Sequence, residues 1–131
     1  MKNTATAPED RPLPSPAWRE ALALFEADLR RRGTAARTQR AYAVDLTQFA
    51  LWCTAQGLDP PAVAPRTLRR YAAALSERGA VAATVARKLA ALRACFRTLR
   101  EDGIVAQSPA DLVASPKQGL RKIASVLAVY A

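Results

Sequence analysis

Histidine is absent from this chain, and two other residue types with a characteristic chemistry are scarce. The 131 residues include two Cys and one Met. Cys53 and Cys95 lie on apolar helical faces with no Cys nearby, and without His they cannot complete a zinc-type ligand set. The sequence therefore predicts no metal site and no cofactor. We expect both thiols to be buried structural residues in a reducing compartment.

Aromatic residues and glycine are also scarce. Aromatics make up 6% of the chain and Gly occurs five times, although half of the residues are hydrophobic. The core must then consist mainly of Leu, Val and Ala, a composition typical of packed helices. No stretch alternates between apolar and polar residues as a half-buried strand would. A chain of this length suits one domain with one core, so we expect a single all-α domain.

Long apolar runs are missing as well. None approaches the roughly 20 residues that a helix needs to cross a bilayer. The N-terminal stretch MKNTATAPEDRPLPSP lacks the apolar middle of a signal peptide. We therefore expect a cytoplasmic protein with neither a membrane-spanning helix nor a membrane partner.

Positive charge, in contrast, is abundant. Lys and Arg total 20 against 11 Asp and Glu, which gives a formal net charge of +9 and a pI near 10.6. Most of these cations are Arg, which forms bidentate contacts with phosphate and guanine. Such a basic domain favours a polyanionic partner, with nucleic acid first and an anionic membrane second. A high-GC genome produces similar Arg-rich and Ala-rich proteins, so charge alone does not establish that the domain binds DNA.

Apolar residues recur at helical spacing in four segments. The first begins at Ser15-Pro16, where a hydroxyl can cap the helix and proline suits its first position. Glycines mark the helix ends, and the Pro-rich stretch DPPAVAP is expected to be a stiff connector between the second and third helices. We predict helices near residues 15–33, 36–56, 65–79 and 82–102, with a short fifth helix at 109–113.

The inward-facing residues of these helices define the expected core. It comprises Trp18, Leu22, Phe25, Leu29, Tyr42, Leu46, Phe49, Cys53, Leu68, Tyr71, Leu75, Val85, Leu89, Leu92, Phe96 and Leu99. Around this core we divide the chain into three parts. These are a polar lead-in over 1–14 that we expect to be disordered, a helical domain over 15–115, and a C-terminal linker over 116–131.

The fourth predicted helix carries a face that is suited to contact with DNA. Small residues allow a helix to approach another surface closely, and Arg87 and Thr84 can donate hydrogen bonds from it, so this face would fit a major groove. Arg93, Arg97 and Arg100 form a separate ridge, spaced to reach a phosphate strand. A solvated Ala/Arg helix explains the same pattern without DNA. The face comprises Ala83, Thr84, Arg87, Ala90, Ala91 and Ala94.

The second predicted helix opens with Arg37, Thr38, Gln39 and Arg40. Two Arg are unusual there, because the partial positive charge of a helix N-terminus favours acidic residues. An external phosphate would resolve this mismatch. The two basic helices together predict a clamp on one side of a DNA duplex.

Two longer stretches resemble signatures of the tyrosine recombinases. GTAARTQRAYAVDLTQFALWC, residues 33–53, is similar to the second-helix signature of their N-terminal domain. ATVARKLAALRACFRTLREDG, residues 83–103, resembles the fourth-helix signature, and SPADLVASPK, residues 108–117, resembles the exit from that domain. The matching positions are Gly33, Thr38, Tyr42, Asp45, Leu46, Phe49, Trp52, Thr84, Arg87, Leu89, Leu92, Arg93, Phe96, Leu99, Gly103, Pro109, Ser115, Pro116 and Lys117.

The resemblance implies a four-helix orthogonal SAM-like bundle, the core-binding domain of a recombinase of the Xer and phage-integrase type. It implies binding of double-stranded DNA at a recombination half-site. The family often has Ser-Pro where Ala35-Ala36 stand here, so we expect Thr34 to cap the second helix. The DNA contacts that the resemblance implies are Arg37, Thr38, Arg40, Thr84, Arg87, Lys88 and Arg93.

The resemblance places catalysis elsewhere, on a Tyr nucleophile surrounded by two Arg, a Lys and His residues. This chain has no His, no neighbour could activate Tyr130, and Gly119-Leu120-Arg121 follows the domain exit too closely to match the first catalytic Arg motif. We therefore expect no catalytic residue and no enzymatic activity in this chain.

The expected partners are DNA and, reached through the linker, a catalytic domain that this chain lacks. We expect the isolated domain to be monomeric. Two alternatives stay open. One is a stand-alone DNA-binding regulator of recombination, and the other is a helical protein-interaction module that does not bind DNA.

Overall fold

The computed structural model describes residues 11–113, and its ordered elements are all helical. The expected linker at 116–131 and the first ten residues of the expected lead-in lie outside the described residues. Residues 11–113 contain no β-strand, in agreement with the predicted fold class. The elements are α1 (Pro16–Arg31), α2 (Ala36–Ala55), the 3₁₀ helix η3 (Pro60–Ala62), α3 (Pro65–Glu77), α4 (Ala82–Glu101) and the 3₁₀ helix η4 (Pro109–Leu112).

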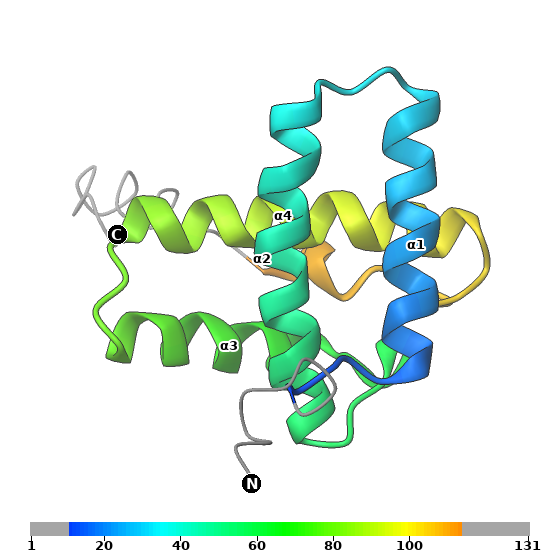
Figure 1. The fold of residues 1–131 in the computed structure, drawn as a ribbon. Helices are drawn as coiled ribbons and strands as arrows, with labels where there is room; N and C mark the ends of the chain where they lie inside the picture. The colour runs from blue at the N-terminus through cyan, green and yellow to red at the C-terminus, as the bar shows by residue number, and fades with distance from the viewer. Residues whose placement is uncertain (1–10, 114–131) are drawn as a thin grey trace, which may run out of the picture.

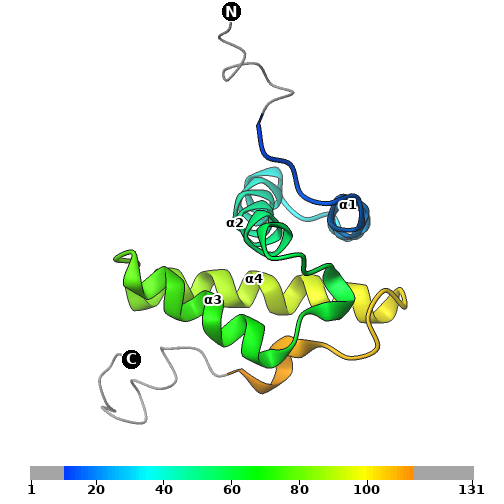
Figure 2. The ribbon, with the colours of Figure 1, turned by 90° about the horizontal axis from the view of Figure 1, so that it is seen from below.

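The helices form two crossed layers. Helices α1 and α2 run antiparallel beside each other, and this pair lies across α4 (Figure 1). Seen from below, α1 and α2 form one layer while α3 and α4 form the other (Figure 2). Helix α4 contacts α1, α2, α3 and η4, which makes it the central element. The predicted orthogonal SAM-like bundle is confirmed, and the expected short fifth helix is the single 3₁₀ turn η4.

The two ends of α1 are set by local sequence, as predicted. Ser15 caps α1 by accepting a hydrogen bond from the Trp18 amide at 3.3 Å, and Pro16 occupies the first helical position. At the other end Gly33 adopts φ +72°, and the Thr34 amide donates to the Leu29 carbonyl at 3.0 Å. This is a Schellman motif, in which a left-handed glycine satisfies the last carbonyls of a helix.

The Pro-rich connector between α2 and α3 contains η3, an element that the sequence did not predict. The start of α1 is bonded to this region. Trp18 Nε1 donates to the Leu58 carbonyl at 2.8 Å, and Ser15 Oγ donates to Asp59 Oδ1 at 2.8 Å. These bonds hold the first turn of α1 against the connector that follows α2.

The core lies between the two layers and centres on aromatic rings from three helices. Trp18 packs edge-on against Phe49, with ring centroids 5.6 Å apart, and against Phe96 at 6.2 Å. The predicted core residues are buried except for Leu22 and Tyr42, which are partly buried and pack against the core. Cys53 and Cys95 are buried free thiols, also as predicted.

Candidate nucleic-acid interface

The N-terminal halves of α2 and α4 meet in one corner of the molecule, where most of the predicted DNA contacts lie. Arg37, Thr38 and Arg40 are exposed on the first turns of α2. Arg87 is exposed on α4, and Thr84 is half-buried one turn before it. In Figure 1, α2 crosses α4 at a steep angle, so the N-terminal half of α2, at the top, and the N-terminal half of α4, at the left, border the same corner.

A hollow of about 210 Å³ marks this corner. Helix α4 contributes Arg87 and two alanines to its lining. Thr38 and Arg87, far apart in the sequence, face the same space. The hollow is lined by Thr38, Ala41, Tyr42, Asp45, Arg87, Ala90 and Ala91.

A charged network joins α2 to α4 beside this hollow. Arg87 donates to Asp45 through both Nε, at 3.1 Å from Oδ2, and Nη2, at 3.0 Å from Oδ1. Lys88 Nζ donates to Asp45 Oδ1 at 2.9 Å and to Gln48 Oε1 at 2.6 Å. The Asp45 side chain is 6% exposed and that of Lys88 10%, whereas that of Arg87 is 60% exposed. Only one of the two cations therefore faces solvent.

The ionisation of Asp45 follows from these contacts. Burial by itself would raise the pKa of the carboxyl group, but the hydrogen bonds and positive charges of Arg87 and Lys88 outweigh it and lower the pKa. The hydrogen bond to Asp45 in turn raises the pKa of Arg87. Asp45 is thus ionised at neutral pH, and the three charged groups together keep a net charge of about +1 on this surface.

The N-terminus of α2 lacks the cap that we expected from Thr34. The N-cap residue is Ala35, which has no side chain that could bond the first amides. Thr34 instead contributes its backbone carbonyl, which accepts a hydrogen bond from Gln39 Nε2 at 2.8 Å. The loop places Thr34 one residue too early to cap the helix. The first turn therefore presents backbone N–H groups and the partial positive charge of the helix between Arg37 and Arg40.

Sequence comparison shows which family of known proteins this chain resembles. A family profile described as phage integrase, N-terminal SAM-like domain, matches residues 22–103, which is more than half of the chain. The chain belongs to this family. All seven predicted DNA-contact residues fall inside the matched range, as do the helix pair α2 and α4 and the network between them.

Curated relatives of the SAM-like domain are tyrosine recombinases. Tyrosine recombinase XerD of Chlorobaculum tepidum is 29% identical over 113 residues, covering 86% of this chain and 37% of the relative. XerD of Bradyrhizobium diazoefficiens is 35% identical over 98 residues, with 75% and 30% covered. XerC of Methylobacterium nodulans is 36% identical over 118 residues, with 86% and 37% covered. The chain thus spans about a third of the length of these relatives.

No solved structure shows significant similarity to this chain. Among the helices of residues 11–113, none combines the length and the apolar character that a membrane span requires.

Two of the predicted contact residues occupy different positions from the rest. Lys88 is buried, with its ammonium group held between Asp45 and Gln48. Arg93 is half-buried, and its Nη2 donates to the Val113 carbonyl at 2.8 Å, so it fastens η4 to α4. The Arg93, Arg97 and Arg100 ridge is accordingly divided, since only Arg97 and Arg100 are exposed.

The small-residue face of α4 is narrower than the sequence indicated. Ala91 is buried in the core, and Ala94 is partly buried and packs against it. Helices α1 and α2 cover this part of α4 because they lie across its middle (Figure 1). The accessible part of the face is its N-terminal half, with Ala83, Arg87 and Ala90 exposed.

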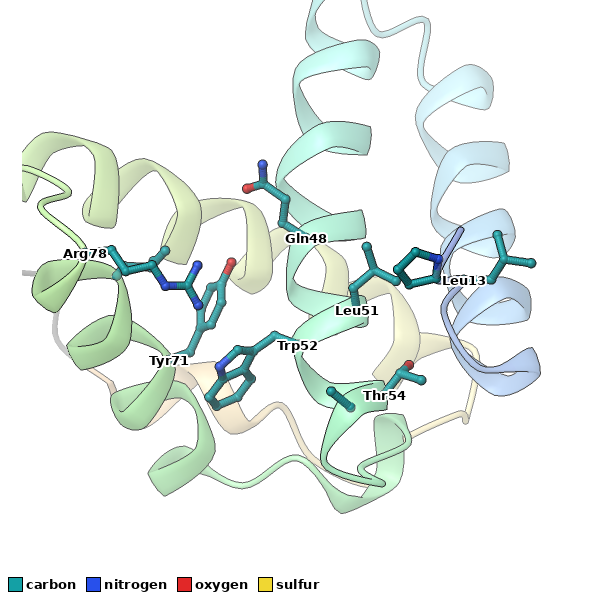
Figure 3. A pocket seen from close by; sticks show the side chains of 10 residues that line it. Leu13, Gln48, Leu51, Trp52, Thr54, Tyr71 and Arg78 are labelled. Atoms are coloured by element: carbon teal, nitrogen blue, oxygen red, sulfur yellow. The ribbon is translucent and has the colours of Figure 1, made fainter. Parts of the chain in front are cut away.

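A second and larger cleft, of about 570 Å³, was not predicted from the sequence. It lies between α2 and α3, where Trp52 and Tyr71 stand next to each other with ring centroids 5.1 Å apart (Figure 3). Leu13, from the segment before α1, lines one edge and Arg78 another. Its lining is mostly apolar, so it differs in character from the charged corner beside Arg87.

Proposed function

We propose that this chain binds double-stranded DNA through the corner formed by the N-terminal halves of α2 and α4. In this proposal it acts as the core-binding domain of a site-specific tyrosine recombinase at a recombination half-site. The observation that carries the proposal is the convergence of Thr38 and Arg87 on one hollow. Arg37 and Arg40 are exposed on the first turns of the helix that carries Thr38.

The chemistry of the corner suits a duplex. The uncapped first turn of α2 offers backbone N–H groups and two arginines to phosphate oxygens, which position a protein on DNA without reading sequence. On α4, Arg87 and Thr84 can donate to base edges in the major groove, while Ala83 and Ala90 permit close approach. In this arrangement Lys88 supports the surface from inside, and Arg93 holds η4 in place, rather than contacting DNA directly.

The names of the relatives support the recombination context. They are tyrosine recombinases, and this chain matches about a third of their length. We propose that strand cleavage and rejoining depend on the part of such proteins beyond the matched region, and that this chain contributes DNA binding but no catalytic group. Its second partner would then be the catalytic domain.

Fluorescence anisotropy with labelled duplexes tests DNA binding. Duplexes recovered from a random pool by the wild-type protein are compared with scrambled duplexes over a series of salt concentrations. Affinity should fall steeply with salt, because binding to phosphates releases counterions. Arg37→Ala and Arg40→Ala should each weaken binding to both duplexes and lower the salt slope by about one for each phosphate that is no longer bound. Arg87→Ala should reduce the preference for the selected duplex.

A matched control removes the same charge elsewhere. Arg69 is exposed on α3, and Arg69→Ala should leave affinity and preference close to those of the wild type. Equal losses for Arg69→Ala and Arg87→Ala would show that net charge alone drives binding, which would contradict the proposed corner. A folded wild-type protein that binds no duplex at low salt would overturn the DNA-binding proposal and favour a protein-interaction module.

A further inference from the structure

The way in which Asp45 holds Arg87 leaves one edge of the guanidinium group available. A guanidinium is planar and carries five N–H donors. Asp45 occupies the edge formed by Nε and Nη2, with both bonds near 3 Å. The edge formed by Nη1 and the second N–H of Nη2 is not used by this pair. Because the Arg87 side chain is 60% exposed, two parallel donors remain for a group outside the protein.

The buried cation beside this pair changes its charge. An isolated Asp–Arg pair is neutral and would attract an anion only weakly. Here Lys88 also bonds to Asp45 Oδ1, and Gln48 Oε1 accepts its other hydrogen bond. Lys88 therefore balances the carboxylate from the interior, and Arg87 keeps its positive charge toward solvent. Geometry and charge thus favour the same kind of ligand, one with two adjacent acceptor atoms.

We propose that Asp45 is a positioning residue, which fixes the Arg87 guanidinium so that its free edge binds a paired acceptor of DNA. Two sources have this chemistry, the two free oxygens of a backbone phosphate and the O6 and N7 atoms of guanine. The inference rests on the proposed function and adds to it which atoms of the corner meet DNA and what holds them there.

The proposal predicts an effect opposite to that of simple electrostatics. Asp45→Asn removes a negative charge from a DNA-binding surface, so a change in charge alone would tighten binding. Loss of positioning instead weakens it, because an amide offers Arg87 only one acceptor oxygen. We expect Asp45→Asn to reduce the affinity for the selected duplex about fivefold or more, as when one bidentate pair with DNA is broken.

A double-mutant cycle separates positioning from a general structural role. Affinity for the same duplex is measured for wild type, Asp45→Asn, Arg87→Ala and the double variant. If Asp45 acts through Arg87, the loss caused by Asp45→Asn disappears in the Arg87→Ala background. If Asp45→Asn weakens binding equally in both backgrounds, or tightens it in the wild-type background, the proposal is overturned.

Because Asp45 is buried, Asn at this position could impair folding, and a second variant keeps the test decisive. Arg87→Lys lies on the surface and preserves the charge, but its ammonium group cannot bind Asp45 and a paired acceptor in the same planar fork. We expect this variant to lose nearly as much affinity as Arg87→Ala. Wild-type affinity in Arg87→Lys would refute the proposal, since charge alone would then suffice.

Modified duplexes distinguish the two sources of the acceptor pair. If Arg87 contacts guanine, replacing one guanine by 7-deazaguanine weakens DNA binding by the wild-type protein and leaves binding by Arg87→Lys unchanged. With a phosphate contact, one methylphosphonate linkage has this selective effect instead. If neither series reveals a position at which wild type and Arg87→Lys differ, the proposal fails even though the domain binds DNA. If the wild-type protein binds no duplex at all, the proposed DNA-binding function itself is contradicted.

Discussion

Buried carboxylates in this domain tie the first helix layer to α4. Asp28 on α1 is 8% exposed and accepts a hydrogen bond from Thr98 Oγ1 on α4 at 3.1 Å. Arg31 and Arg32 also contact Asp28, each at 2.8 Å. Asp45 on α2 is bonded to α4 through two cations of that helix, Arg87 and Lys88. Each acid therefore fixes how one helix of the first layer crosses α4.

The Asp28–Thr98 bond should contribute measurably to stability. Thr98→Val keeps the shape of the side chain but removes its hydroxyl donor, so the free energy of unfolding should fall by about 1 kcal/mol. Urea denaturation followed by circular dichroism measures it. Thr47→Val, at a half-buried position on α2, is the matched control and should change stability much less. Equal losses for both variants would mean that the bond across the layers contributes nothing of its own.

Asp45 predicts how stability depends on pH. Its pKa in the folded protein lies below the ordinary value near 3.8, so the stabilisation it provides is complete above that ordinary value. The stabilisation is lost as pH falls through the folded pKa. The difference in unfolding free energy between wild type and Asp45→Asn should therefore be largest at pH 5 to 7 and shrink below about pH 3.8.

Urea unfolding at a series of pH values checks this expectation. Glu26→Gln changes an exposed carboxylate on α1 and provides the comparison, with a small difference from wild type at each pH. A gap between wild type and Asp45→Asn that stays constant from pH 7 to pH 2.5 would show that the charge of Asp45 is not what stabilises the fold.

At the scale of residues, the sequence indicated the corner but not its internal bonds. Arg87 was identified on the small-residue face of the fourth predicted helix. Thr38 was identified in the first turn of the second predicted helix and through the family resemblance. The pairing of Asp45 with Lys88 joins residues on different helices, and no periodicity within one helix reports which residue lies opposite. Lys88 was accordingly predicted as a DNA contact, although the crossing of α2 over α4 buries it.

At the scale of elements, the positions at which helices begin and end were the most predictable feature. The expected starts at Ala36, Pro65 and Ala82 agree with the structure, and α2 and α4 end one residue before the predicted positions. Glycine and proline act through their own backbone geometry, so their signal is present in the local sequence. The sequence alone did not reveal the turn η3 or the start of α2 at a residue without a capping side chain.

Gly33 gives a direct test of how α1 ends. A Cβ atom at this position would meet nothing within 4 Å, so the cost of a substitution comes only from φ +72°. Gly33→Ala should destabilise the domain by about 1 kcal/mol, because residues with a side chain disfavour the left-handed region. Gly33→Asn should cost less, since Asn tolerates this conformation better. Thermal unfolding that ranks Ala above Asn in stability would contradict this account.

For the molecule as a whole, the sequence predicted an all-α domain and the resemblance predicted an orthogonal SAM-like bundle. The sequence did not show which residues of different helices lie next to each other on the surface. The apolar cleft between α2 and α3 is one example, because Trp52 and Tyr71 belong to different helices and each has the spacing of a core residue. Only the packed arrangement shows that their rings border an accessible cleft (Figure 3).

The two cysteines give each layer its own thiol. Cys53 belongs to α2 and Cys95 to α4, and burial raises the pKa of each to about 12. Because the thiolate is the reactive form, an Ellman-type reagent should label the native domain far more slowly than the denatured chain. Absorbance during labelling of Cys53→Ala and Cys95→Ala measures each thiol separately. Labelling of either variant at the rate of the denatured chain would contradict the burial.

Because each thiol lies in a different layer, their labelling rates report how the native state opens transiently. If the bundle opens as one cooperative unit, both thiols become accessible at the same rate. If one layer detaches first, its thiol reacts earlier. A ligand that bridges α2 and α4 should slow both reactions together, because detachment would separate it from one of the two helices.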